Sequence, residues 1–171
     1  MNDIALKSNI QESATQEIVV DEVFPHAPET IWKTLTTGEL IGRWFMAPTG
    51  FEPTKGKQFT YQTTPAGKWD GVIHCQVLEV TPNKRLVYAW RGGHDENIGY
   101  GSLLETVVTW TLTRIDSGTR LRLVHSGFRT PTNDFAFKGM SEGWPKVLQK
   151  IDTISGERDP AKSQHQEAPK T

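Results

Sequence analysis

The most regular apolar pattern in this chain lies near its C-terminus, between about Asp134 and Ser155. Apolar residues recur there at spacings of three and four, which places them on one side of a helix, and charged residues fill the other side. The apolar positions are Phe137, Met140, Trp144, Val147, Leu148, Ile151 and Ile154. Because Pro145 removes a backbone donor and crowds the preceding turn, we expect one kinked helix, with two consecutive helices as the alternative.

The preceding part of the chain is rich in β-branched residues and in period-two alternation, and it predicts mostly strands. The predicted strands are residues 17–24, 56–64, 68–80, 84–91, 103–115 and 119–128. The last two form a hairpin across Asp116-Ser117-Gly118. Two short helices, 28–37 and 39–46, follow the first strand, with Pro28 at a first helical position. A long glycine-rich loop occupies residues 91–102.

Alternation assigns the side chains of these strands to faces. Glu79 is interpreted as pointing outward, so His74 and Gln76 are expected to point inward with the bulky residues of the other strands. An apolar lining with a few polar groups is typical of ligand pockets, although buried polar groups can equally be satisfied by their neighbours. The predicted cavity residues are Trp44, Phe45, His74, Gln76, Tyr88, Trp90, Val108, Trp110, His125, Met140 and Trp144.

Length and charge restrict the function classes. A chain of 171 residues suits one domain, expected at 17–155, with a flexible polar tail at 1–16 and a disordered tail at 156–171. The net charge of -1 and the absence of a basic stripe argue against nucleic acid and membrane as partners. The single cysteine, Cys75, cannot form an internal disulfide. With no signal-peptide or membrane-span pattern, a cytoplasmic location is expected.

No motif for a metal, a cofactor or a catalytic group is recognisable. The chain lacks zinc-ligand spacings and phosphate-binding glycine motifs, so no metal site and no cofactor are predicted. His94, Asp95 and Glu96 on the glycine-rich loop are interpreted as a solvated cluster. Ser126 follows His125 directly, and because adjacent strand residues point to opposite faces, this pair does not predict a catalytic triad.

The order of strand, two short helices, strands and long final helix resembles the helix-grip fold of START-like proteins. Four stretches resemble the activator of heat-shock-protein-90 ATPase-like family more closely: HAPETIWKTLTTGELIGRWF, VLEVTPNKRLVYAW, TVVTWTLTRIDSGTRLRLVHSGF and EGWPKVLQKI. The resemblance implies an α+β fold in which a curved antiparallel sheet wraps the C-terminal helix around a cavity. Trp44, Trp90, Trp110, His125 and Trp144 match positions favoured in the family and are interpreted mainly as structural.

Three functions are compatible with these observations. The first is binding of a small apolar or aromatic molecule between sheet and helix, in a stress- or toxin-related role, by a monomer or weak dimer. The second is a cyclase- or hydrolase-type enzyme that uses His74, His125 or Tyr88 as a general acid or base. The third is a co-chaperone, which rests on the family's name alone. A flexible point between Gly143 and Pro145 would let the first half of the helix act as a lid.

Overall fold

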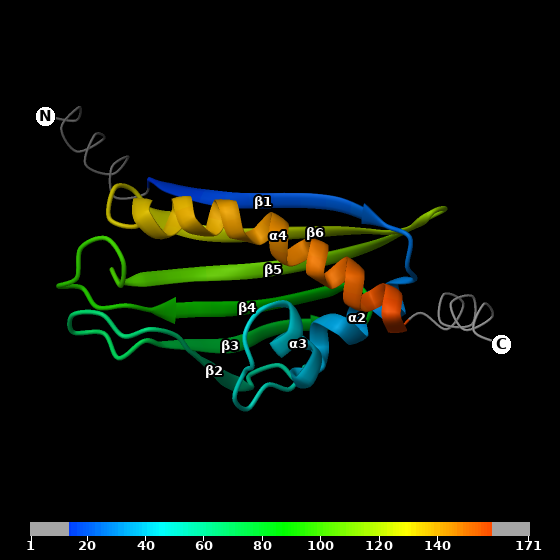
Figure 1. Ribbon diagram of the computed structural model, residues 1–171, viewed down its shortest axis with the longest axis horizontal. Coiled ribbons are helices and arrows are strands. Elements are labelled where there is room, and N and C mark those ends of the chain that lie inside the picture. The colour runs from blue at the N-terminus through cyan, green and yellow to red at the C-terminus, as the bar shows by residue number, and fades with distance from the viewer. Residues whose placement is uncertain (1–13, 159–171) are drawn as a thin grey trace, which may run out of the picture.

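A six-stranded antiparallel sheet and one long helix dominate the computed structural model, which describes residues 14–158 (Figure 1). The strand order is β1-β6-β5-β4-β3-β2, so the first two strands of the chain form opposite edges of the sheet. The elements are β1 (Thr15–Phe24), α2 (Pro28–Thr36), α3 (Gly38–Trp44), β2 (Gln58–Gln62), β3 (Val72–Thr81), β4 (Arg85–Gly92), β5 (Leu104–Ile115), β6 (Gly118–Arg129) and α4 (Asp134–Arg158). This is the α+β helix-grip fold that the sequence predicted.

The helices α2, α3 and α4 cover the same face of the sheet (Figure 1). α4 packs on β1 and against α2 and α3. Two polar contacts join its C-terminal half to the region of α2: His26 Nε2 lies 2.6 Å from Asp152 Oδ1, and the Thr34 and Ser155 hydroxyls are 2.9 Å apart. The C-terminal half of α4 is thus anchored. None of the described helices is long and apolar enough to cross a membrane.

Several element boundaries differ from the sequence prediction. β1 begins at Thr15 and α4 continues to Arg158, so part of each predicted tail belongs to a regular element, while 1–13 and 159–171 lie outside the described residues. α4 is one helix that contains Pro145, so the two-helix alternative is wrong. Residues 68–71 are not strand, because Ala66 and Trp69 exchange two backbone hydrogen bonds and close a turn there.

The inward orientation predicted for His74 and Gln76 is wrong. The pairing of β3 with β4 shifts between Val77 and Glu79, which leaves Leu78 as an extra residue with 41% of its surface exposed. A β-bulge of this kind reverses the alternation on either side of it. Counting back from Glu79 across the bulge therefore assigned the wrong face. Before the bulge, Ile73 and Cys75 point inward.

Tryptophan rings fill the middle of the layer between sheet and helices. Trp110 and Trp144 meet edge to face with their ring centroids 5.8 Å apart, and Trp44 meets Trp110 at 5.7 Å. Each of the three is almost completely buried. The Trp44 indole N–H donates to the Thr34 carbonyl oxygen, which also fixes α3 against α2. The centre of the molecule is therefore a closed aromatic core.

Gly118 gives a test of the β5–β6 hairpin. Its φ is +143°, a region that L side chains rarely adopt, and a Cβ there would collide with the Phe24 carbonyl oxygen. Gly118→Ala is expected to lower the free energy of unfolding by about 1–3 kcal/mol in urea denaturation. Gly38→Ala is the matched control, because a Cβ at Gly38 meets nothing within 4 Å. Equal effects of the two substitutions would contradict this backbone geometry.

Candidate functional site

An apolar groove lies between the N-terminal half of α4 and the β3–β4 side of the sheet. Its main cavity has a volume of about 360 Å³, and a second cavity of about 230 Å³ adjoins it along the helix. Both cavities are lined by Phe45, Trp90, Gly139 and Met140, so they form one continuous groove. The other lining residues are Met46, Thr63, Trp69, Ile73, Gly92, Gly93, Tyr100, Gly101, Ser102, Leu104, Phe135 and Ala136 in the main cavity, and Gly143, Trp144 and Val147 in the second.

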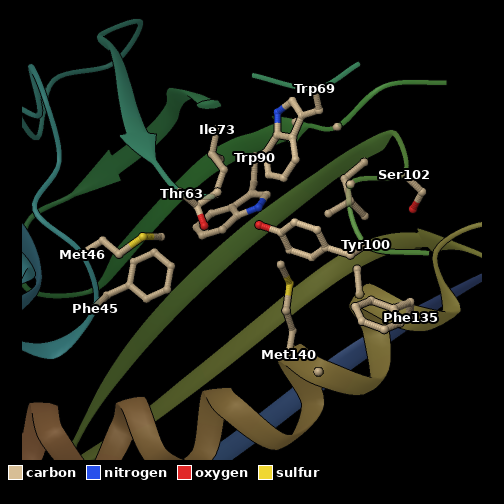
Figure 2. Close-up of a pocket in the computed structure, with 16 residues that line it drawn as sticks. Phe45, Met46, Thr63, Trp69, Ile73, Trp90, Tyr100, Ser102, Phe135 and Met140 are labelled. Atoms are coloured by element: carbon tan, nitrogen blue, oxygen red, sulfur yellow. The ribbon is translucent and has the colours of Figure 1, made fainter. Parts of the chain in front are cut away.

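Aromatic rings form the floor and walls of this groove. The ring centroid of Phe45 lies 5.5 Å from that of Trp90. Phe45 also stacks on Trp144, with their ring centroids 5.9 Å apart. Figure 2 shows Phe45, Met46, Trp90 and Met140 around the same space, with Tyr100 reaching into it from the loop opposite α4. Flat apolar surfaces of this kind bind apolar ligands through burial of area and ring contacts.

Two glycines of α4 leave space in the groove. A Cβ built on Gly139 or Gly143 would meet nothing within 4 Å, so close packing does not require glycine at either position. Glycine in a helix interior is less favourable than alanine by about 1 kcal/mol. The missing side chains at Gly139 and Gly143 widen the cavity between the helix and the Trp90 side of the sheet, at this cost in helix stability.

Two loops close one end of the groove: residues 63–71, between β2 and β3, and residues 93–103, between β4 and β5. Tyr100 Oη donates to the Thr64 carbonyl oxygen at 2.8 Å, and Asn97 Nδ2 donates to the Ala66 carbonyl oxygen at 2.7 Å. The ring centroids of Trp69 and Tyr100, one from each loop, lie 5.7 Å apart. The Tyr100 ring also contacts that of Phe135 in the first turn of α4. The glycine-rich loop, predicted at residues 91–102 and expected to be flexible, is therefore tied across the groove in this structure.

The predicted cavity residues divide into three sets. Four of them line the groove: Phe45, Trp90, Met140 and Trp144. Five lie in the closed core and do not line it: Trp44, Tyr88, Val108, Trp110 and His125. The remaining two, His74 and Gln76, are on the outer face of the sheet beside Thr60 and Arg91.

His125 is held in its neutral form inside the core. Thr106 Oγ1 donates to the Trp90 carbonyl oxygen at 2.9 Å, so it accepts a hydrogen bond from His125 Nε2, 2.8 Å away. His125 Nδ1 in turn accepts from the Trp144 indole N–H at 3.1 Å. Burial lowers the pKa of His125 to about 3. Both ring nitrogens are occupied, so His125 has no free atom for acid–base chemistry in the groove.

Tyr88 and Cys75 likewise do not act as an acid, a base or a nucleophile in the groove. The Tyr88 hydroxyl accepts a hydrogen bond from the Trp110 indole N–H at 3.1 Å, and burial raises its pKa well above the ordinary value. Burial likewise raises the pKa of the Cys75 thiol, which keeps it protonated and unreactive. Neither group lines the groove. The three residues proposed as acid or base, His74, His125 and Tyr88, are therefore all outside it.

The residues that sequence reasoning missed come mostly from the loops and from the first turn of α4. Trp69, Tyr100 and Phe135 are aromatic residues in or next to irregular segments, where no alternation assigns a face. The sequence offers only a weak signal for them, because single apolar residues on loops are common and need no apolar partner. Ile73 was missed because of the bulge in β3.

His94, Asp95 and Glu96 offer potential metal-ligand atoms that all lie within 4.8 Å of one another. The cluster lies largely at the surface, and His94 Nδ1 already accepts a hydrogen bond from the Glu96 backbone N–H at 3.1 Å. These features agree with the interpretation of this cluster as a solvated part of the loop.

The sequence matches a known protein family. The model of the family described as activator of Hsp90 ATPase homolog 1-like protein matches residues 25–156. Protein MLL2253 from Mesorhizobium loti is similar in structure, with 37% sequence identity and a TM-score of 0.73, over 84% of this chain and 99% of that one. No protein of curated function matches the sequence.

More distant solved structures share the fold. Protein BH1534 from Bacillus halodurans is 21% identical, with a TM-score of 0.64 over 82% of this chain and 96% of that one. CalU16 from Micromonospora echinospora is 20% identical, with a TM-score of 0.63 over 88% of this chain and 81% of its own. At these identities the similarity is evidence of a common architecture alone.

Proposed function

Because this chain belongs to the family described as activator of Hsp90 ATPase homolog 1-like proteins, and has their helix-grip fold, we propose that it binds a small apolar molecule in the groove beside α4. The observation that carries this proposal is the groove itself, about 360 Å³ in its main cavity and lined almost entirely by apolar side chains. That volume lies within the range of small-molecule sites. The aromatic pair Phe45 and Trp90 favours a ligand with a flat apolar part.

The position of the titratable groups favours binding over catalysis. Acid–base catalysis requires a group within hydrogen-bond reach of the substrate. Of the described residues that line the groove, Tyr100 alone has an ionisable side chain, and its hydroxyl donates to the Thr64 carbonyl oxygen. A molecule held between Trp90 and Met140 is thus surrounded by groups that bind apolar surface and do not transfer protons.

Gly139→Leu is expected to weaken ligand binding at least about tenfold, because the added side chain occupies the space shared by the two cavities. A Cβ at Gly139 meets nothing within 4 Å, and leucine is a better helix former than glycine, so the fold should be retained. Binding is measured by NMR shift mapping with a panel of neutral aromatic compounds and fatty acids, read at the Trp90 and Trp144 indole N–H groups.

Lys138→Leu is the matched control for this substitution. It adds the same side chain one residue earlier, about 100° around the helix from Gly139 and away from the groove, and should leave binding unchanged. If no compound in the panel shifts the Trp90 or Trp144 signals, or if Gly139→Leu binds as well as the unchanged chain, the groove is not the binding site.

A further inference from the structure

The two cavities of the groove differ in polarity. The main cavity is lined by three hydroxyl-bearing residues, Thr63, Tyr100 and Ser102. The second cavity, along α4, is lined by apolar residues and glycines only. A ligand that fills both cavities would therefore place any polar atom in the main cavity and apolar surface against Trp144.

The hydroxyls of the main cavity are suited to a neutral polar group. Among residues 14–158, the Thr63 hydroxyl makes no hydrogen bond, and Figure 2 shows Thr63 next to Trp90. Ser102 Oγ accepts from Asn133 Nδ2 at 3.4 Å, which leaves its own hydrogen available. Such hydroxyls can donate to a carbonyl or exchange hydrogen bonds with a hydroxyl.

Within residues 14–158, no positively charged side chain lines the groove to hold an acidic ligand. None of its lining residues is lysine, arginine or histidine. The loop 93–103 carries Asp95 and Glu96 and neither lysine nor arginine. Lys68 on the facing loop is paired with Glu96 at 2.8 Å, and by helical spacing Lys138 points away from the groove. An ionised carboxylate moved from water into such a site would lose hydration without gaining a partner.

Resting on the proposed function, we propose that the groove selects an uncharged, flat ligand with one neutral hydroxyl or carbonyl directed toward Thr63, and discriminates against the corresponding carboxylic acids. The acids are ionised near neutral pH, because an ordinary carboxyl has a pKa of about 4. Fatty acids and aromatic acids are thus poor ligands, whereas aromatic alcohols, phenols and ketones of similar size are good ones.

The test compares 2-naphthol with 2-naphthoate on the full chain at pH 7.5 by titration calorimetry. The neutral compound is expected to bind at least about tenfold more tightly. When the pH is lowered toward the pKa of the acid, the affinity for the acid should rise, because its uncharged form becomes populated. Intermolecular NOEs should place the naphthol hydroxyl end near the Thr63 methyl group and the opposite edge near Trp144.

A gain-of-function variant makes the charge argument sharper. Met140→Lys places a cation in the groove and is expected to reverse the preference in favour of 2-naphthoate, while the uncharged control Met140→Gln should keep it. Equal or tighter binding of 2-naphthoate by the unchanged chain overturns the selectivity and leaves the proposed function standing. Binding of neither compound up to its solubility limit counts against the proposed function itself.

Discussion

Replacement of Trp144 by alanine is expected to lower the free energy of unfolding by about 3–5 kcal/mol, as for other large aromatic side chains removed from a core. Trp144 is only 4% exposed and lies within ring-contact distance of Trp110, Trp90 and Phe45. The substitution also removes the N–H that donates to His125 Nδ1, leaving a buried acceptor without its partner. A loss of this size is a large fraction of the stability of an ordinary domain, which is about 5–15 kcal/mol.

Urea denaturation followed by far-UV circular dichroism measures this loss. Phe135→Ala is the control on the same helix, because Phe135 is 59% exposed and its removal should change the stability by about 0.5 kcal/mol or less. A loss below about 1 kcal/mol for Trp144→Ala would mean that this side chain does not pack between sheet and helix as described.

His125 should make the fold sensitive to acid. Its folded-state pKa of about 3 is below the ordinary histidine value of 6.5, so between these values the unfolded chain binds a proton that the folded chain does not. The contribution of His125 to stability is therefore complete above pH 6.5 and is lost as the pH falls toward 3. Between pH 7.5 and pH 4 the loss from this residue amounts to about 3 kcal/mol.

The difference between the unchanged chain and His125→Gln isolates this contribution from that of the carboxylates, which titrate in the same range. Glutamine does not titrate, and its amide oxygen can still accept from the Trp144 N–H. Stability measured in urea at several pH values should thus fall more steeply below pH 6.5 in the unchanged chain. Parallel curves would show that His125 has the same pKa in the folded and the unfolded chain, which would contradict its complete burial.

Most elements of this fold follow from local patterns in the sequence. The inner faces carrying Val108, Trp110 and His125 were predicted correctly, because regular alternation continues along β5 and along β6 as far as His125. The apolar side of α4 was predicted for the same reason, as Leu148, Ile151 and Ile154 are all buried at helical spacing. Family resemblance then arranged these elements as a helix-grip domain.

The position of the groove did not follow from the sequence in the same way. Alternation correctly placed Trp110 and His125 on the inner face, yet these residues fill the core and leave no space there. The groove opens farther along α4, where Gly139 and Gly143 face Trp90 and where Tyr100 and Trp69 approach from two loops. These residues come from separate segments, and none of them identifies the others by spacing.

The sequence by itself determined the order of the elements, the inner faces of the regular strands and the apolar side of the last helix. Each of these depends on a repeat of two or 3.6 residues within one segment. The three-dimensional structure was needed for the face of His74, which the bulge at Leu78 reverses, and for the location of the groove. Unfilled space is what remains after side chains from distant segments have packed together, and no local period encodes that remainder.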